Sequence, residues 1–200
     1  MTQQELWNKK FSKDGYFYGT NVNEFLKSCE HLFSNSKTIL CLGEGEGRNA
    51  IYFAQKGFYV EAIDASNIGL EKLRKKALAN NLEIDTLCMD LQDWIPLKKY
   101  EAVISSYLHV YENQRDKLFD KIELSLEKNA YFVGEFFSKN QINYSSGGPK
   151  DLELLYDKSD FENRFKSCKK IKVEEEIVHL NEGSGHQGEA SVIRVILQKK

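Results

Sequence analysis

The stretch that decides the fold is ILCLGEGEGRN, residues 39–49, where an apolar run breaks into three glycines alternating with two glutamates. A short, nearly continuous apolar run is typical of a strand buried on both faces of a parallel sheet. A glycine-rich turn after such a strand lets the backbone approach a ligand at the start of the next helix. Glu44 and Glu46 are unusual there, because a bound phosphate would meet two carboxylates on the turn itself.

Apolar runs of the same kind recur along the chain at intervals that leave room for a helix between them. They are FYVEAID (58–64), IDTLCM (84–89), YEAVISS (100–106) and AYFVGEFF (130–137). The intervening residues show helical spacing: Leu118, Ile122 and Leu126 recur every four positions, and Ser66 is placed to cap a helix start. Strand-helix alternation predicts a doubly wound α/β sheet.

The carboxyl-terminal part breaks this alternation. KIKVEEEIVHL (170–180) and ASVIRVILQKK (190–200) indicate two strands whose connecting loop is too short for a crossover helix, so they should pair antiparallel. We therefore predict a Rossmann-like seven-stranded sheet, mostly parallel with a C-terminal antiparallel hairpin, in one domain spanning 1–200. Residues 1–35 are expected to form a lid and helix segment, and 138–165 a substrate-side insertion.

Composition disfavours several function classes. The 200 residues carry 29% charged side chains that balance to a net charge of −2, so no strong field attracts nucleic acid or an anionic membrane. No apolar stretch reaches the roughly 18 residues that span a bilayer, and the amino terminus lacks a signal-peptide pattern. We expect a cytoplasmic protein without a membrane or nucleic-acid partner.

The four cysteines, Cys29, Cys41, Cys88 and Cys168, are far apart in the sequence. None forms a C-x-x-C pair or a zinc-ligand spacing. We expect buried free thiols and no metal site.

Two cofactors fit the glycine turn by spacing. Residues 45–50 match G-x-G-x-x-A, the dinucleotide pattern, and Asp64 follows near the offset of a ribose-binding acid, so an NAD-dependent dehydrogenase is one alternative. Charge favours the other, because S-adenosylmethionine has no phosphate and carries a sulfonium and an ammonium group. A turn that carries glutamates tolerates that ligand.

Further motifs follow at each strand end: EAIDAS (61–66), MDLQDW (89–94) and AVISSYLHV (102–110). Together with the glycine turn they resemble the S-adenosylmethionine site of class I methyltransferases. The resemblance implies that Asp64 binds the ribose hydroxyls, Asp90 lies near the adenine amino group and Glu44 near the cofactor's amino group. The cofactor-binding residues it implies are Gly43, Glu44, Gly45, Gly47, Arg48, Asp64, Ala65, Ser66, Asp90, Leu91, Ser105 and Ser106. Taken singly, Asp64 could instead cap the following helix, and Asp90 could be an ordinary loop acid.

The remaining segments resemble a small bacterial subgroup of single-domain methyltransferases related to the tellurite-resistance type. These segments are WNKKFSKDGYFYGTNVNEFL (7–26), EFFSKNQINYSSGGPKD (135–151) and LNEGSGHQGEASVIRVI (180–196). The resemblance implies a small-molecule acceptor, and by family analogy a thiol or chalcogen oxyanion. The fourth strand lacks the Asn/Asp-Pro-Pro-aromatic pattern of enzymes that methylate adenine or glutamine amino groups.

Methyl transfer from a sulfonium needs alignment and a dry pocket, and a protonated acceptor also needs a base. His186, expected in the hairpin loop, and His109 are candidates for that base, and Glu135 is a third site candidate. Trp7, Tyr18 and Gly19 are candidates for an aromatic lid, although the aromatic residues there could equally cap the core. Arg48 could meet the cofactor carboxylate or a substrate anion, or form a salt bridge with Glu46.

The sequence therefore predicts a methyltransferase that uses S-adenosylmethionine to methylate a small molecule, as a monomer or homodimer. A cofactor-binding protein without catalysis and, less favoured, an NAD-dependent dehydrogenase are the alternatives.

Overall fold

The computed structural model describes residues 2–34 and 36–200, and its centre is a seven-stranded sheet with the strand order β3-β2-β1-β4-β5-β7-β6. The parallel strands are β1 (Thr38–Leu42), β2 (Tyr59–Asp64), β3 (Ile84–Cys88), β4 (Tyr100–Ser106) and β5 (Leu126–Phe137). β7 (His186–Lys199) pairs antiparallel with both β5 and β6 (Cys168–Glu182). The predicted fold class is confirmed.

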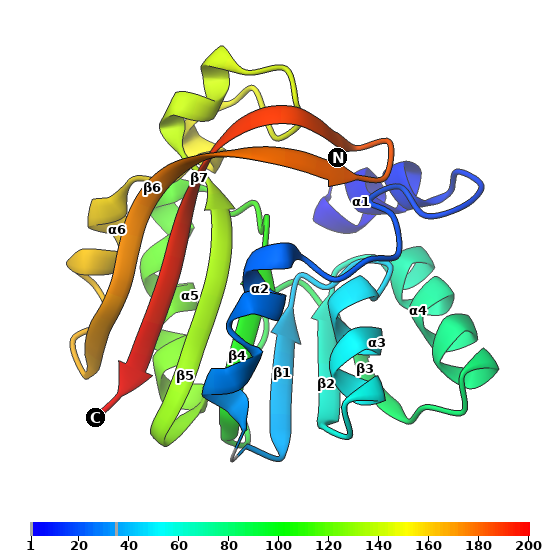
Figure 1. The fold of residues 1–200 in the computed structure, drawn as a ribbon, viewed down its shortest axis with the longest axis horizontal. Coiled ribbons are helices and arrows are strands. Elements are labelled where there is room, and N and C mark those ends of the chain that lie inside the picture. Colours follow the sequence, from blue (N-terminus) through cyan, green and yellow to red (C-terminus); the bar gives the residue numbers. More distant parts are fainter. Residues whose placement is uncertain (1, 35) are drawn as a thin grey trace.

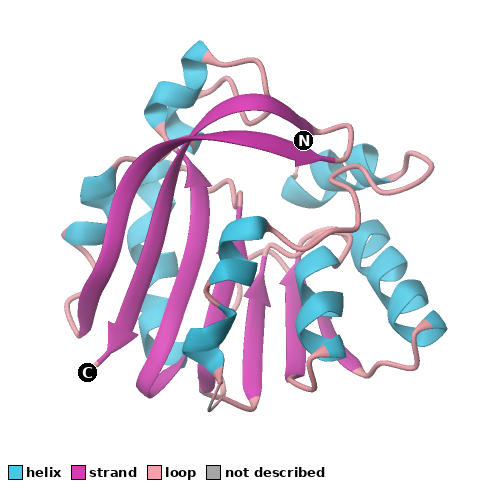
Figure 2. Cartoon of the chain, in the orientation of Figure 1, coloured by secondary structure: helices cyan, strands magenta, loops and turns pink. Residues whose placement is uncertain are grey.

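Helices cover both faces of the sheet (Figure 1, Figure 2). They are α1 (Gln3–Phe11), α2 (Glu24–Ser28), α3 (Arg48–Gln55), α4 (Asn67–Ala79), α5 (Glu112–Ser125) and α6 (Lys158–Glu162), with short 3₁₀ helices η1 (Glu30–Phe33), η2 (Lys139–Asn143) and η3 (Leu152–Leu154). One face buries Phe53 and Leu73 of α3 and α4, and the other buries Phe119 and Phe161 of α5 and α6. Burial on both faces explains why the parallel strands are apolar along their length.

Local signals set several helix ends. The Ser66 hydroxyl accepts a hydrogen bond from the Gly69 amide at 3.0 Å, as the predicted cap of α4. α3 ends at Gln55, and Gly57 follows with φ of 90°. Leu126, predicted as the last apolar residue of a helical face, is instead the first residue of β5, because the chain becomes extended there with ψ of 134°.

The terminal hairpin is longer than predicted, and this corrects the position of His186. The connecting loop shrinks to residues 183–185, and Glu182 pairs with His186 in the strand register. The polar residues that suggested a loop lie on strands that extend beyond the rest of the sheet, where one face is open to solvent. In Figure 1 this end of β6 and β7 curves over the carboxyl ends of the parallel strands toward α1.

Three of the cysteines are buried, but Cys88 is exposed, contrary to the prediction. Cys88 ends β3, which is an edge strand with a neighbour on one side only. Among residues 2–34 and 36–200, no helix combines the length and the apolar character needed to cross a membrane.

Candidate active site

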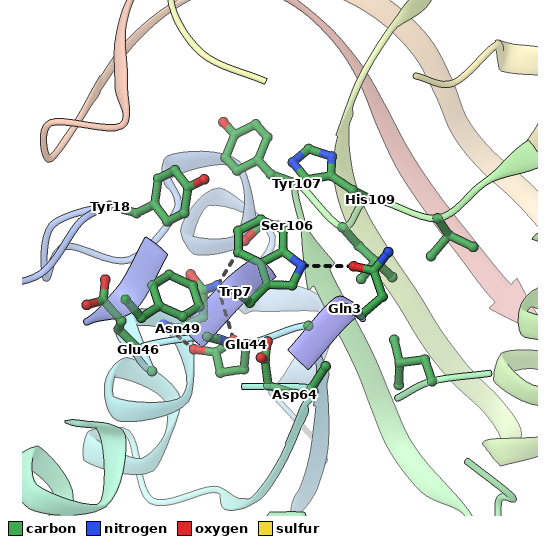
Figure 3. A pocket seen from close by; sticks show the side chains of 18 of the residues that line it. Gln3, Trp7, Tyr18, Glu44, Glu46, Asn49, Asp64, Ser106, Tyr107 and His109 are labelled. Atoms are coloured by element: carbon green, nitrogen blue, oxygen red, sulfur yellow. Dashed lines mark hydrogen bonds between the residues drawn. The ribbon is translucent and has the colours of Figure 1, made fainter. Parts of the chain in front are cut away.

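A cavity of about 940 Å³, its open mouth included, lies at the carboxyl ends of β1, β2 and β4. Its walls are the glycine turn after β1, the residues that end the neighbouring strands, part of α1 and the first residue of β7. Open α/β sheets bind their ligands at this edge, outside the carboxyl ends of the strands. In Figure 3, Glu44 and Asp64 lie on one side of Trp7, and Tyr107 and His109 lie on the other.

Most of the residues predicted for the site line this one cavity. They are Trp7, Tyr18, Gly19, Gly43, Glu44, Gly45, Gly47, Arg48, Asp64, Ala65, Asp90, Leu91, Ser106, His109 and His186. Ser66, Ser105 and Glu135 are not part of its wall. Ser66 caps α4, and the Ser105 hydroxyl is turned into the sheet, where it donates to the Leu42 carbonyl at 2.9 Å.

The glycines of the turn are required by both backbone conformation and space. Gly47 has a φ of 91°, and a Cβ atom there would lie 2.4 Å from Cγ of Leu73 on α4. At Gly45 a Cβ would lie 2.9 Å from the ring of Phe11 on α1. Only glycine therefore lets α4 and α1 pack directly against the turn.

Glu44 is the cap of α3. Gly47, at the start of that helix, has no side chain to cap it, and Oε1 of Glu44 accepts hydrogen bonds from the amides of Asn49 and Ala50, both at 2.8 Å. Burial raises the pKa of Glu44 to about 7, against the opposing effect of these hydrogen bonds. One oxygen of the carboxylate thus stabilises the helix start.

Glu46 attaches the amino-terminal segment to the turn. Its carboxylate accepts hydrogen bonds from the Phe17 amide at 2.7 Å and from Nζ of Lys72 at 2.7 Å. The suggested salt bridge between Arg48 and Glu46 is absent from the described residues, because Arg48 pairs with Glu182 of β6 at 2.9 Å. The two glutamates of the turn therefore support the walls of the cavity, one at α3 and one at the amino-terminal segment.

Asp64 ends β2 with both carboxylate oxygens oriented by backbone amides. It accepts hydrogen bonds from Gly45 at 2.8 Å and from Ser66 at 2.7 Å. Burial raises the pKa of Asp64 to about 6. The carboxylate is held rigidly in the cavity wall while each oxygen retains a lone pair for a ligand.

Tyr107 is a site residue that the sequence analysis missed. It follows β4 with a φ of 53°, a left-handed conformation that is rare for a bulky side chain. Its hydroxyl donates to Oε1 of Glu135 at 2.5 Å, and Oε2 of Glu135 pairs with Arg194 at 2.7 Å. Glu135 is thus buried behind the cavity wall, where it supports Tyr107. The only sequence signal for Tyr107 was its place directly after the strand-ending serines.

His109 lies between two aromatic rings. Its ring centroid is 5.6 Å from that of Trp7 and 6.3 Å from that of Phe137, with both pairs nearly parallel. Burial, together with the nearby charge of Lys10, lowers the pKa of His109 to about 3. The imidazole is therefore neutral at physiological pH and contributes a flat polar surface to the cavity.

His186 is enclosed from several directions. Its ring centroid lies 4.3 Å from that of Tyr18, 4.5 Å from that of Tyr107 and 5.1 Å from that of Phe137. Nδ1 lies 2.9 Å from Oε2 of Glu182. Nε2 is buried and has no hydrogen-bond partner among the described residues. An unpartnered buried polar atom calls for an explanation, and this one belongs to a residue that lines the cavity.

Comparison with known proteins identifies the region that holds the glycine turn. Residues 39–129 match a family model described as a methyltransferase domain. The match covers 91 of the 200 residues and identifies this region as a methyltransferase domain. Its cofactor is S-adenosylmethionine. No curated protein sequence matches the chain.

Solved structures share the fold over nearly the whole chain. One, described as converting a disulfide bond into a thioacetal group during echinomycin biosynthesis, superposes with a TM-score of 0.81 over 100% of this chain and 92% of its own, at 14% identity. TehB from Haemophilus influenzae gives 0.73 over 100% and 68%, at 14% identity. The N-methyltransferase NodS from Bradyrhizobium japonicum, in complex with S-adenosyl-L-homocysteine, gives 0.74 over 100% and 99%, at 9% identity.

The cavity of the methyltransferase domain suits this cofactor chemically. Carboxylates of Glu44, Glu46, Asp64 and Asp90 line it, and the charge of Arg48 is offset by Glu182. This environment favours a ligand with an ammonium and a sulfonium group over a pyrophosphate. The family match ends at residue 129, so Tyr18 and His186 lie in flanking segments that complete the cavity.

Proposed function

We propose that this S-adenosylmethionine-dependent methyltransferase methylates a small molecule with a soft nucleophile, such as a thiol or a chalcogen oxyanion. One observation carries the proposal. The cavity continues from the acid-lined turn after β1 to a group of aromatic residues and His186, whose buried Nε2 has no hydrogen-bond partner among the described residues. Such an arrangement aligns an acceptor with the methyl group and excludes water.

We assign the cofactor to the end of the cavity formed by residues 43–91. We propose that Asp64 accepts hydrogen bonds from the ribose hydroxyls. Asp90 would lie near the adenine amino group, with Leu91 beside the ring. The backbone at Gly43, Gly45 and Gly47 would approach the methionine portion, beside Glu44. We give Ser66 and Ser105 supporting roles, because their hydroxyls are engaged with α4 and with β1.

The other end of the cavity, here called the acceptor end, is formed by Trp7, Tyr18, Tyr107, His109 and His186. It is unfavourable for a cationic amine. Glu182 is paired with Arg48, and Glu135 behind Tyr107 is paired with Arg194. Nζ of Lys10 lies 4.6 Å from the Trp7 ring centroid and donates to the Tyr18 hydroxyl at 2.8 Å. With the carboxylates compensated and a lysine on the aromatic rings, neutral or anionic acceptors are favoured.

For an acceptor that carries a proton, we propose His186 as the general base. Its Nε2 has no partner among the described residues and can take a proton, whereas the low pKa of His109 makes that ring a poor base. We propose a substrate-contacting role for His109. Trp7, Tyr18 and Gly19 would form the lid, and residues 1–200 would act as one unit because both flanking segments close the cavity.

The experiment is thermal unfolding with S-adenosylhomocysteine, with NAD or with neither, followed by mass spectrometry of acceptor mixtures incubated with S-adenosylmethionine. A ligand at 100 times its dissociation constant adds about 2.7 kcal/mol, which we expect from S-adenosylhomocysteine alone. We then expect methylated thiols or chalcogen oxyanions. Binding without any methylated small molecule, or methylation of a protein or RNA instead, would contradict the acceptor proposal.

A further inference from the structure

The carboxylate of Glu182 contacts the ring of His186 and orients it. Glu182 ends β6 directly opposite His186, which begins β7, so the hairpin register sets the two side chains together. Its Oε2 lies 2.9 Å from Nδ1 of His186. Arg48 holds the same carboxylate through two nitrogens, Nη1 at 2.9 Å from Oε1 and Nη2 at 3.1 Å from Oε2. This two-point contact fixes the plane of the carboxylate.

The contact determines which ring nitrogen carries the proton. A carboxylate only accepts hydrogen bonds, so Nδ1 must be the protonated nitrogen of the neutral imidazole. Nε2 then carries the lone pair, and it is the atom that is buried without a partner. Although burial acts to raise it, the hydrogen bond from His186 and the charge of Arg48 lower the pKa of Glu182, which keeps this carboxylate ionised.

Packing prevents the ring from turning over. Tyr18, Tyr107 and Phe137 surround it with centroid distances of 4.3 to 5.1 Å. On another side, a Cβ on Gly147 would lie 2.6 Å from Cδ2 of His186, so the backbone there is in close contact with the ring edge. Exchange of the two nitrogens by ring rotation would require these neighbours to move.

Charged groups face His186 from several elements. Arg48 of α3 and Lys10 of α1 disfavour its protonation, as does burial, while Glu182 of β6 favours it. Tyr18 and Tyr107 remain neutral, because burial raises both pKa values. The balance lowers the pKa of His186, so the ring is neutral at physiological pH.

We propose that Glu182 is a positioning residue that holds His186 in the Nδ1-protonated form, with Nε2 directed to the proton of the methyl acceptor. The inference rests on the proposed function of His186 as base. As the acceptor's heteroatom forms its bond to the methyl carbon, the electron pair of the S–C bond remains on the cofactor sulfur, and the acceptor's proton moves to Nε2. Glu182 then stabilises the imidazolium through its charge.

The test is nitrogen NMR of ¹⁵N-histidine-labelled protein bound to S-adenosylhomocysteine, with the His186 signals assigned by their loss in His186→Gln. In the wild type we expect a protonated Nδ1 and an unprotonated Nε2. In Glu182→Gln the amide can also donate to Nδ1, so the Nε2-protonated form should appear. The matched control is Glu176→Gln, which removes another β6 carboxylate that pairs with an arginine, Arg194 at 2.7 Å, and should leave the spectrum unchanged.

The NMR result tests the role of Glu182 separately from the proposed methyl acceptor, because the spectrum requires no turnover. A protonated Nε2 in the wild type, or an unchanged spectrum in Glu182→Gln, would overturn the inference. If Glu182→Gln does not fold, the spectra of the wild type and of Glu182→Asp still test whether Glu182 sets the protonated nitrogen of His186. Once a thiol acceptor has been identified, kcat for its methylation should be up to about 100-fold lower in Glu182→Gln, with KM nearly unchanged. In the pH profile of kcat, the fall in rate on the acidic side should move to lower pH, because removal of the carboxylate lowers the pKa of His186. A purely structural defect would not move this profile.

Discussion

The cofactor end and the acceptor end of the cavity are built in different ways. The cofactor end comes from residues 43–91, and its lining residues lie at the ends of parallel strands or in the turns and helix starts after them, so the fold's regular alternation is sufficient to assemble it. The acceptor end joins segments that are far apart, as when the Ser184 hydroxyl donates to the Phe17 carbonyl across 167 positions. Local patterns thus specify the first end, and long-range packing specifies the second.

The largest expected difference between the two ends is in catalysis. His186→Gln should lower kcat for a protonated acceptor by about 100- to 10,000-fold, because it removes the proposed base. The affinity for S-adenosylhomocysteine should change by less than about threefold. Steady-state kinetics and calorimetry measure the two quantities. Equal losses of turnover and cofactor affinity would mean that the ends are not independent.

The converse variant at the cofactor end is Asp64→Asn. We expect a loss of about 100-fold in affinity for S-adenosylhomocysteine, since two charge-assisted hydrogen bonds to ribose hydroxyls would be weakened. Isothermal calorimetry measures the affinity, with Asp93→Asn as a control outside the cavity wall. Unchanged affinity in Asp64→Asn would remove this residue from the cofactor site.

Gly47→Ala tests the packing of the turn. A left-handed conformation and a Cβ 2.4 Å from Leu73 should together cost about 2–4 kcal/mol of stability, measured by urea unfolding. Gly57→Ala is the matched control, because its φ of 90° is nearly the same and no atom lies within 4 Å of the added Cβ. If both variants lost equal stability, the close approach of α4 to the turn would contribute nothing.

The smallest expected effect is a pH dependence at Glu44. Because burial raises its pKa to about 7 in the folded protein, the carboxyl group contributes stability at low pH that is lost as the pH rises toward 7. In Glu44→Gln, which keeps the capping oxygen, this loss should be absent. The difference in unfolding free energy between wild type and variant should change by on the order of 2 kcal/mol between pH 5 and pH 8. Parallel pH profiles would contradict the raised pKa.

Much of the fold followed from the sequence because its signals are local. The apolar runs located all of the parallel strands, and Ser66 located the start of α4. The hairpin was placed correctly but too short, since polar residues on a strand that projects from the sheet look like those of a loop. Cys88 was wrongly expected to be buried, because an apolar run does not reveal which strand lies at the edge.

Some residues of the candidate site were also predicted from the sequence, and others were not. The motif residues that line the cavity, such as Asp64 and Asp90, lie at or just after the end of a strand, and the resemblance to class I methyltransferases predicted them there. Glu182 and Tyr107 were missed, and Glu135 was predicted for the cavity but lies behind it. That Glu182 contacts His186 while Glu135 contacts Tyr107 depends on strand register and side-chain direction, and neither is visible in composition or spacing.

The sequence by itself determined the α/β alternation, the glycine turn and the acidic character of the cofactor end, because each depends on neighbouring residues and on the period of the chain. Tertiary structure decided the rest. It turned Glu44 toward α3 and Glu46 toward Lys72 and Phe17, and it set His186 against Glu182 and Tyr107. These contacts depend on how strands and helices from opposite ends of the chain pack, since burial gives each charged group a partner that local sequence does not specify.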